Sequence, residues 1–167
     1  MSFLIWLIVV YAFYRLYHLA TGTLKPTQFG FKGKLVYSDQ GRSSKLFINK
    51  RFGLSAKPDF IYNLLNGMFA LVEYKSRNGR IFQSDIEQTI AGVIACRPHY
   101  NIRVAVIQTA SERKEINVDK SVEELYEMIK HNVELTRKIK NGLKVDTCYP
   151  TKYKCKSCAV ANNCQFK

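Results

Sequence analysis

Three residues near the middle of the chain have the types and spacing that metal-dependent phosphodiester chemistry uses. Pro58-Asp59 is followed, after thirteen intervening residues, by Glu73-Tyr74-Lys75, so the chain carries the pattern PD-x13-E-x-K. In a strand, Glu73 and Lys75 point to one face and Tyr74 to the other. If Asp59 begins the neighbouring strand of a hairpin, its carboxylate converges on the face that carries Glu73 and Lys75.

This arrangement would suit hydrolysis of a phosphodiester. Two carboxylates supply the hard oxygen ligands that Mg²⁺ or Mn²⁺ prefers, and such a metal polarises the phosphodiester and activates water. Lys75 would orient or help to deprotonate that water, and Gln88 on the next predicted helix places an amide near the same site. The alternative is a solvated ion pair between Glu73 and Lys75 with no chemical role. The apolar residues before Glu73 favour a site, because they put the charges at the end of a core strand.

Four of the five cysteines lie within the last twenty residues: Cys148, Cys155, Cys158 and Cys164. A disulfide framework would distribute its cysteines through a small secreted chain, so this grouping indicates reduced thiolates that bind a metal. Zn²⁺ and a [4Fe–4S] cluster both accept four cysteines. Zinc ribbons usually pair two C-x-x-C knuckles and this chain has one, which favours the iron–sulfur cluster and leaves Zn²⁺ as the alternative.

Sequence patterns predict the elements that must position these residues. Short strands are expected at 34–37 and 45–48 around a turn at 39–41, and two more at 59–62 and 68–75, joined near Asn66-Gly67. A helix is expected over 83–96, followed by a buried central strand over 103–108. The last helix begins at the capping box of Ser121 and Glu124 and ends before Gly142. This order predicts an α/β or α+β sandwich.

The first 24 residues predict an apolar N-terminal helix. No charge occurs before Arg15, which is the only formal charge up to Leu24. We expect a single-pass anchor in the inner or cytoplasmic membrane, with the basic residues that follow keeping the rest of the chain in the cytoplasm. The alternative is a cytoplasmic protein in which this helix is buried. The expected organisation is then an anchor (1–24), a linker (25–33), a core (34–147) and a cysteine segment (148–167).

Charge and composition limit the kinds of partner. The 167 residues include 26 Lys and Arg against 13 Asp and Glu, a net charge of +13, and 47% are hydrophobic. This hydrophobic content excludes a disordered basic tail. The charge predicts an anionic partner, either nucleic acid or an anionic membrane surface. The basic residues expected to contact DNA are Lys57, Lys154 and Lys156.

Together these motifs resemble the RecB-type PD-(D/E)XK nucleases, in particular the CRISPR-associated iron–sulfur exonuclease group and its stand-alone, membrane-anchored relatives. FGLSAKPD at 52–59 is similar to the group's GL(S/T)G(K/R)PD, and EYKS at 73–76 to its E-(V/Y)-K-(S/T). Ser84-Asp85-x2-Gln88 resembles the group's helical glutamine motif, although Gly92 stands where the group usually has tyrosine. Cys155-x2-Cys158-x5-Cys164 resembles its iron–sulfur clamp.

The resemblance covers residues 34–165 and implies a restriction-endonuclease-like α/β core, in which a mixed central sheet is flanked by helices. It implies that Asp59 and Glu73 bind Mg²⁺ or Mn²⁺, that Lys75 is the catalytic lysine and that Gln88 is the motif glutamine. The expected function is a metal-dependent DNA nuclease, an exonuclease on single-stranded ends, with a C-terminal iron–sulfur cluster. The alternative is a catalytically inactive, membrane-tethered DNA-binding module whose cysteines hold a structural metal.

Overall fold

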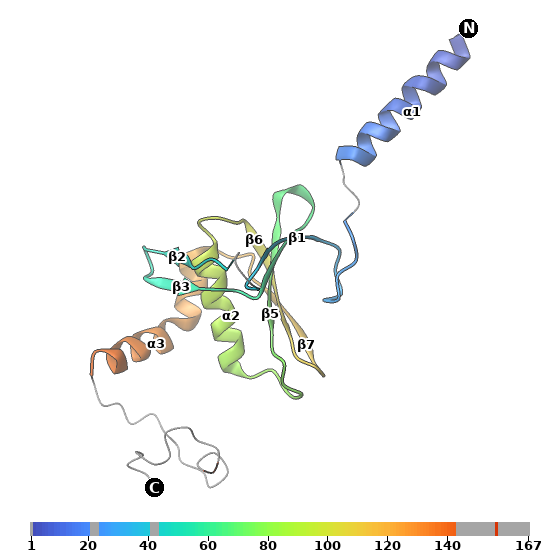
Figure 1. Ribbon diagram of the computed structural model, residues 1–167. Helices are drawn as coiled ribbons and strands as arrows, with labels where there is room; N and C mark the ends of the chain where they lie inside the picture. Colours follow the sequence, from blue (N-terminus) through green and yellow to red (C-terminus); the bar gives the residue numbers. More distant parts are fainter. Residues whose placement is uncertain (1, 21–23, 41–43, 143–155, 157–167) are drawn as a thin grey trace. The chain divides into compact units, whose positions relative to one another are not determined.

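The structure is a computed structural model that describes residues 2–20, 24–40, 44–142 and 156 (Figure 1). The chain divides into two compact units, residues 1–130 and 131–167. The sheets, α2 and the first turns of α3 belong to the first unit, and the remainder of α3 belongs to the second.

A five-stranded mixed sheet forms the centre of the first unit. Its strand order is β1-β4-β5-β6-β7, and only the β5–β6 pair is parallel. The strands are β1 (Lys34–Ser38), β4 (Phe60–Asn63), β5 (Phe69–Tyr74), β6 (Ile102–Gln108) and β7 (Arg113–Asn117). The predicted α/β class with a mixed sheet is therefore confirmed.

The β4–β5 hairpin forms where the sequence predicts it. Asn66 and Gly67 both have positive φ, 61° and 69°, which is the conformation that an Asn-Gly hairpin turn requires. They lie in a short 3-10 turn, η2 (Leu65–Gly67), which leads into β5. The hairpin register pairs Phe60 with Val72, so one step further along Asp59 stands opposite Glu73.

The two strands predicted around residues 39–41 do not pair with each other. β1 pairs with β4, whereas β2 (Phe47–Asn49) pairs with β3 (Leu54–Ala56) in a separate two-stranded sheet. The pairing of β1 with β4 buries Tyr37, whose hydroxyl donates to the carbonyl oxygen of Lys45. The segment after β1 is thereby fixed against β1 without a ladder between β1 and β2.

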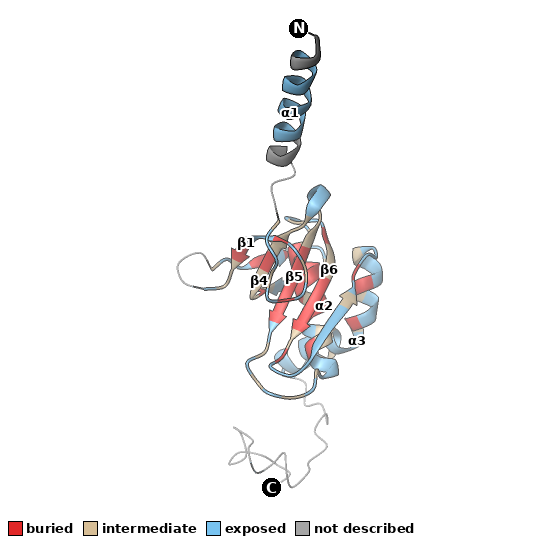
Figure 2. Ribbon diagram, turned by 90° about the vertical axis from the view of Figure 1, so that its right-hand side faces the viewer, coloured by how far each residue is buried: buried red, intermediate tan, exposed pale blue. Residues whose placement is uncertain are grey.

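The helix α2 (Gln83–Cys96) has the bounds that the sequence predicts and packs on β5, β6 and the β2–β3 pair. Gly92 lies on its buried face, where an added Cβ would stand 3.7 Å from Leu71 Cδ1. Leu71 therefore faces α2, and so do Glu73 and Lys75 because strand side chains alternate. The buried centre of the sheet is visible beside α2 in Figure 2.

The opposite face of the sheet is covered by the segment 25–33, for which the sequence predicts a linker. Phe29 is buried against Val72 and Val106, and the rings of Phe31, Phe60 and Tyr62 surround it. The guanidinium of Arg113 on β7 donates to the carbonyl oxygen of Phe29 at 2.7 Å. This segment thus contributes to the core.

The helix α1 (Ser2–Ala20) has 19 residues, and its described side chains, those of residues 5–16, are exposed. Within the part of the chain that the structure describes, none of the helices combines the length and the apolar character that crossing a membrane requires. The predicted single-pass membrane anchor is therefore wrong. A span needs about 20 predominantly apolar residues, and the uncharged run at the start of this chain ends at Tyr14.

The helix α3 (Val122–Lys140) begins at the predicted capping box. The Ser121 hydroxyl accepts the backbone N–H of Glu124 at 3.1 Å, and the Glu124 carboxylate accepts the Ser121 N–H at 2.8 Å. Leu125 and Ile129 are the buried residues of this helix.

Candidate active site

Four residues predicted from the sequence meet at the carboxyl end of β5. Asp59 precedes β4, Glu73 and Lys75 lie at the end of β5, and Gln88 lies in the second turn of α2. Glu73 and Lys75 face α2, as Leu71 does, and this orientation brings the Gln88 amide within reach of both. The structure thus brings together the residues of the sequence pattern and the motif glutamine.

Glu73, Lys75 and Gln88 form a closed triangle of hydrogen bonds. The Lys75 ammonium donates to Glu73 Oε1 at 2.8 Å and to Gln88 Oε1 at 2.9 Å. The Gln88 amide nitrogen donates to Glu73 Oε1 at 2.9 Å. Gln88 therefore bridges the carboxylate and the ammonium, which fixes the orientation of all three side chains.

Asp59 is held by the backbone that carries Glu73. Its Oδ2 accepts the backbone N–H of Tyr74 at 2.7 Å, across the hairpin. Beyond the end of β5, the N–H of Lys75 donates to the carbonyl oxygen of Gln108 at 2.8 Å and so extends the parallel ladder. Both strands of the hairpin and the neighbouring β6 therefore contribute to the rigidity of the site.

Glu73 is a buried residue, with 8% of its surface exposed. The pKa of its carboxyl group is raised above the usual value. Burial is the main cause, and the negative charge of Asp59 adds to it, whereas the hydrogen bond and charge of Lys75 act in the opposite direction. A buried acid with a raised pKa beside a second acid is typical of functional sites. A bound cation would relieve both the burial cost and the repulsion.

Within the described part of the chain, no group of three or more His, Cys, Asp or Glu side chains lies close enough to hold a metal ion. The prediction of a metal-binding group is therefore wrong for those residues as regards a group of three or more such protein ligands. Asp59 and Glu73 remain as a pair. Mg²⁺ commonly binds through one or two carboxylates together with waters and substrate phosphates.

The donor set of this pair fits such a cation. The hydrogen bonds that Glu73 accepts from Lys75 and Gln88 both end on Oε1. The hydrogen bond that Asp59 accepts from the Tyr74 N–H ends on Oδ2. Glu73 Oε2 and Asp59 Oδ1 thus remain as hard oxygen donors from the two strands of one hairpin.

A second buried carboxylate, Asp85, lies beside the site in the first turn of α2. It is 5% exposed and forms an ion pair with Arg77, and its Oδ2 accepts the N–H of Phe82 at 2.8 Å. Burial would raise the pKa of Asp85, but the Phe82 N–H and the Arg77 guanidinium outweigh it, so that its pKa lies below the usual value. Asp85 therefore fixes the start of α2. Its position three residues into the predicted helix was the only sequence signal for this role.

The loop between Lys75 and Phe82 is tied to the β6–β7 turn. The N–H of Gly79 donates to the Ser111 hydroxyl at 3.1 Å, and the Thr109 hydroxyl donates to the Gly79 carbonyl oxygen at 2.9 Å. The N–H of Ile81 donates to the Glu112 carboxylate at 2.8 Å. Three hydrogen bonds thus fix this loop against the β6–β7 turn, a property that the sequence pattern did not reveal.

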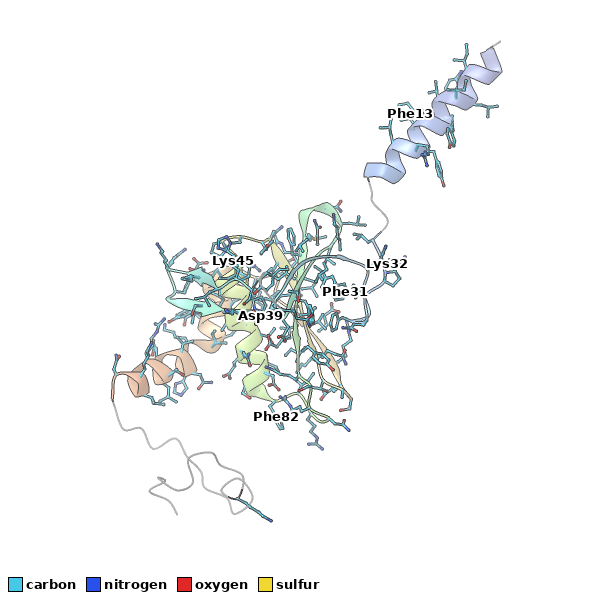
Figure 3. The ribbon with its side chains drawn as sticks, viewed as in Figure 1. Phe13, Phe31, Lys32, Asp39, Lys45 and Phe82 are labelled. Carbon is cyan, nitrogen blue, oxygen red and sulfur yellow. The ribbon has the colours of Figure 1, made fainter. Side chains whose placement is uncertain are left out.

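The predicted DNA-binding lysines fall in different places. Lys57 is exposed, and its ammonium donates to the Ser44 hydroxyl at 2.9 Å. Ser44 in turn contacts the carboxylate of Asp39, a residue labelled in Figure 3, and the N–H of Asp39 donates to the Asp59 carbonyl oxygen at 3.0 Å. Lys57 thus belongs to a polar cluster next to Asp59. Lys156 is exposed, and Lys154 lies outside the described residues.

The four predicted cluster ligands, Cys148, Cys155, Cys158 and Cys164, also lie outside the described residues. Cys96 is fully buried on α2, and burial raises the pKa of its thiol to about 12. It is a core residue, as its helical position predicts. Gly92 is likewise a packing residue between α2 and Leu71, so the position at which the resembling group has tyrosine faces the core in this chain.

Comparison with models of known protein families found no match, and comparison with curated proteins found none either.

Proposed function

We propose that this protein is a metal-dependent DNA nuclease of the PD-(D/E)XK type, acting on single-stranded ends. The observation that carries the proposal is the convergence of Asp59, Glu73, Lys75 and Gln88 at one end of the sheet, with hydrogen bonds of 2.8–2.9 Å joining the last three. The net charge of +13 supports an anionic polymer as the substrate.

Each residue has a role that its contacts support. Asp59 Oδ1 and Glu73 Oε2 would hold a Mg²⁺ or Mn²⁺ ion together with the substrate phosphate. When bound, such an ion supplies Lewis-acid polarisation of the phosphodiester and a more acidic water. An ammonium group has three donors, and the contacts with Glu73 and Gln88 use two of those on Lys75. The third donor is suited to a phosphate oxygen or to the attacking water, where it offsets negative charge.

Gln88 is a positioning residue in this scheme. It keeps the Lys75 ammonium beside Glu73 and holds Oε1 of Glu73 in place, so that the same carboxylate presents its other oxygen toward the cation. The proposed iron–sulfur cluster at Cys148, Cys155, Cys158 and Cys164 stays a prediction, with Zn²⁺ as the alternative metal.

Cleavage of a labelled single-stranded oligonucleotide by the full chain, prepared without oxygen, tests the proposal. With Mn²⁺ we expect cleavage that falls about 100-fold or more in Asp59→Asn, Glu73→Gln and Lys75→Ala. The matched control is Asp119→Asn, which removes an exposed carboxylate paired with Arg103 and should cleave like the wild type. Wild-type activity retained by Asp59→Asn would overturn the mechanism. DNA binding without cleavage in either metal would instead favour the inactive DNA-binding module.

A further inference from the structure

The residue at the N-cap of α2 is a phenylalanine, although this position strongly prefers a small polar side chain. Phe82 makes no side-chain capping bond, and Asp85 satisfies the Phe82 N–H instead. Serine, threonine, aspartate or asparagine would serve the helix better here. A residue that contradicts its local structural preference often marks a functional position.

The Phe82 ring is presented to solvent on a rigid support. Its residue exposure is 56%, and the Arg77 guanidinium lies over the ring at 5.0 Å from its centroid. Arg77 is itself fixed by the buried Asp85 carboxylate. The loop that leads to Phe82 is tied to the β6–β7 turn by the hydrogen bonds of Gly79 and Ile81. The ring therefore loses little conformational freedom when a ligand binds on it.

The location of Phe82 links it to the candidate active site. The loop 76–81 runs directly from Lys75 to Phe82, and Gln88 lies six residues further along the same helix, a rise of about 9 Å. Figure 3 labels Phe82 at the end of α2 that the loop from β5 enters. A polymer strand that lies across Glu73 and Lys75 would thus come within a few nucleotides of this ring.

We infer that Phe82 stacks on an unpaired nucleobase of the DNA strand next to the candidate active site. The inference rests on the proposed function, because a base is available only if the substrate is nucleic acid. Single isolated apolar residues on a surface need no explanation, but Phe82 combines exposure with a disfavoured N-cap position, rigid support and proximity to the site. A base paired in a duplex is already stacked, so this contact would favour single strands.

Binding of fluorescently labelled single-stranded DNA and of the corresponding duplex, both measured by anisotropy in EDTA on the full chain, tests this inference. Phe82→Ser should weaken single-strand binding roughly 10-fold, as expected for the loss of one stacked base, and leave duplex binding unchanged. Because serine is a favourable N-cap residue, this variant should unfold in urea no earlier than the wild type. Phe82→Trp should retain single-strand binding.

The matched control is Leu65→Ser, which changes an apolar residue of similar exposure (50% against 56%) at the other end of β5. It should leave both affinities unchanged. Quenching of a 2-aminopurine base by the wild type, absent in Phe82→Ser, would support stacking directly. An unchanged affinity of Phe82→Ser, or an equal loss on duplex, would overturn the inference.

The two proposals can fail separately. Selective loss of single-strand binding in Phe82→Ser, without wild-type cleavage in Mn²⁺, would leave the stacking residue in place and remove the nuclease. Cleavage that depends on Asp59, with no effect of Phe82→Ser on binding, would remove only the stacking residue.

Discussion

Two buried carboxylates at the same end of the sheet have pKa values that are shifted in opposite directions. Glu73 and Asp85 are 8% and 5% exposed, and each pairs with a basic residue two or eight positions away in the chain. The pKa of Glu73 is nevertheless raised and that of Asp85 is lowered. Burial alone therefore does not decide whether the pKa of a carboxylate is raised or lowered.

The difference lies in what surrounds each group. Asp85 accepts a backbone N–H at a helix N-terminus and contacts a guanidinium, two environments that favour the ionised form. For Glu73, burial raises the pKa most and the repulsion by Asp59 adds to it, and the Lys75 ammonium and the Gln88 amide, which both donate to one oxygen, do not compensate. The surroundings of Asp85 thus favour its ionised form. The surroundings of Glu73 disfavour its ionised form, and a further positive charge nearby would stabilise it.

The largest effect that would test this contrast is expected at Asp85. Asp85→Asn should lower the free energy of unfolding by about 2 to 3 kcal/mol, because it leaves the Arg77 guanidinium without its buried partner. The loss should be greatest above the ordinary pKa of aspartate and should shrink as the pH falls through the lowered folded pKa, where the wild-type carboxyl group is also neutral. Urea denaturation across a pH series measures both.

The control for Asp85 is the exposed pair of Asp119 and Arg103. Asp119→Asn should change the free energy of unfolding by less than about 0.5 kcal/mol. Equal losses in the two variants would show that Asp85 has no special structural role.

A smaller effect of opposite sign is expected at Glu73. The folded state holds a proton on Glu73 more tightly than the unfolded chain does, so this group lowers stability as the pH rises above its ordinary value of 4.5. Glu73→Gln should therefore raise the free energy of unfolding at neutral pH by about 1 kcal/mol, and the gain should vanish in acid. Thermal unfolding at several pH values measures this difference.

Added Mg²⁺ sharpens the same comparison. It should stabilise the wild type and leave Glu73→Gln unchanged, because a ligand stabilises only the state that binds it. If Glu73→Gln is instead strongly destabilised at neutral pH in the absence of Mg²⁺, Glu73 is a structural carboxylate like Asp85.

The smallest effect is expected at Glu124, which occupies the same helix position in α3 that Asp85 occupies in α2. Glu124 caps Ser121 but is exposed, and the hydrogen bonds from Ser121 lower its pKa. Glu124→Gln should leave the urea midpoint nearly unchanged, since water can replace those bonds. A midpoint shift as large as that of Asp85→Asn would show that the capping position, and not burial with Arg77, produces the stability.

Local sequence signals predicted much of the fold. The helix 83–96 was identifiable from its apolar spacing, the β4–β5 turn from Asn66-Gly67, and the shared face of Glu73 and Lys75 from strand alternation. In each case the deciding interaction lies within a few residues of sequence, so the pattern and the structure depend on the same geometry.

Features that depend on distant parts of the chain were missed. The pairing of β1 with β4 is a choice among possible partners that no local pattern specifies. β7 reads Arg-Lys-Glu-Ile-Asn and lacks apolar alternation, as is common in an edge strand. At the site, the sequence predicted the proximity of Asp59, Glu73 and Gln88. The individual hydrogen bonds of Gln88 to Glu73 and Lys75 were not specified, because they depend on how α2 packs on β5.

The mixed strand order also bears on the sequence of events during folding. The β4–β5 and β6–β7 hairpins close over short turns, whereas the parallel pair joins residues 69 and 102 and requires α2 to form between them. Bringing distant parts of the chain together costs conformational entropy before the contacts that stabilise the pair have formed. The acidic pair should therefore assemble early, and the bridge through Gln88 only in the last step, an order that φ-value analysis of the hairpin and of α2 would resolve.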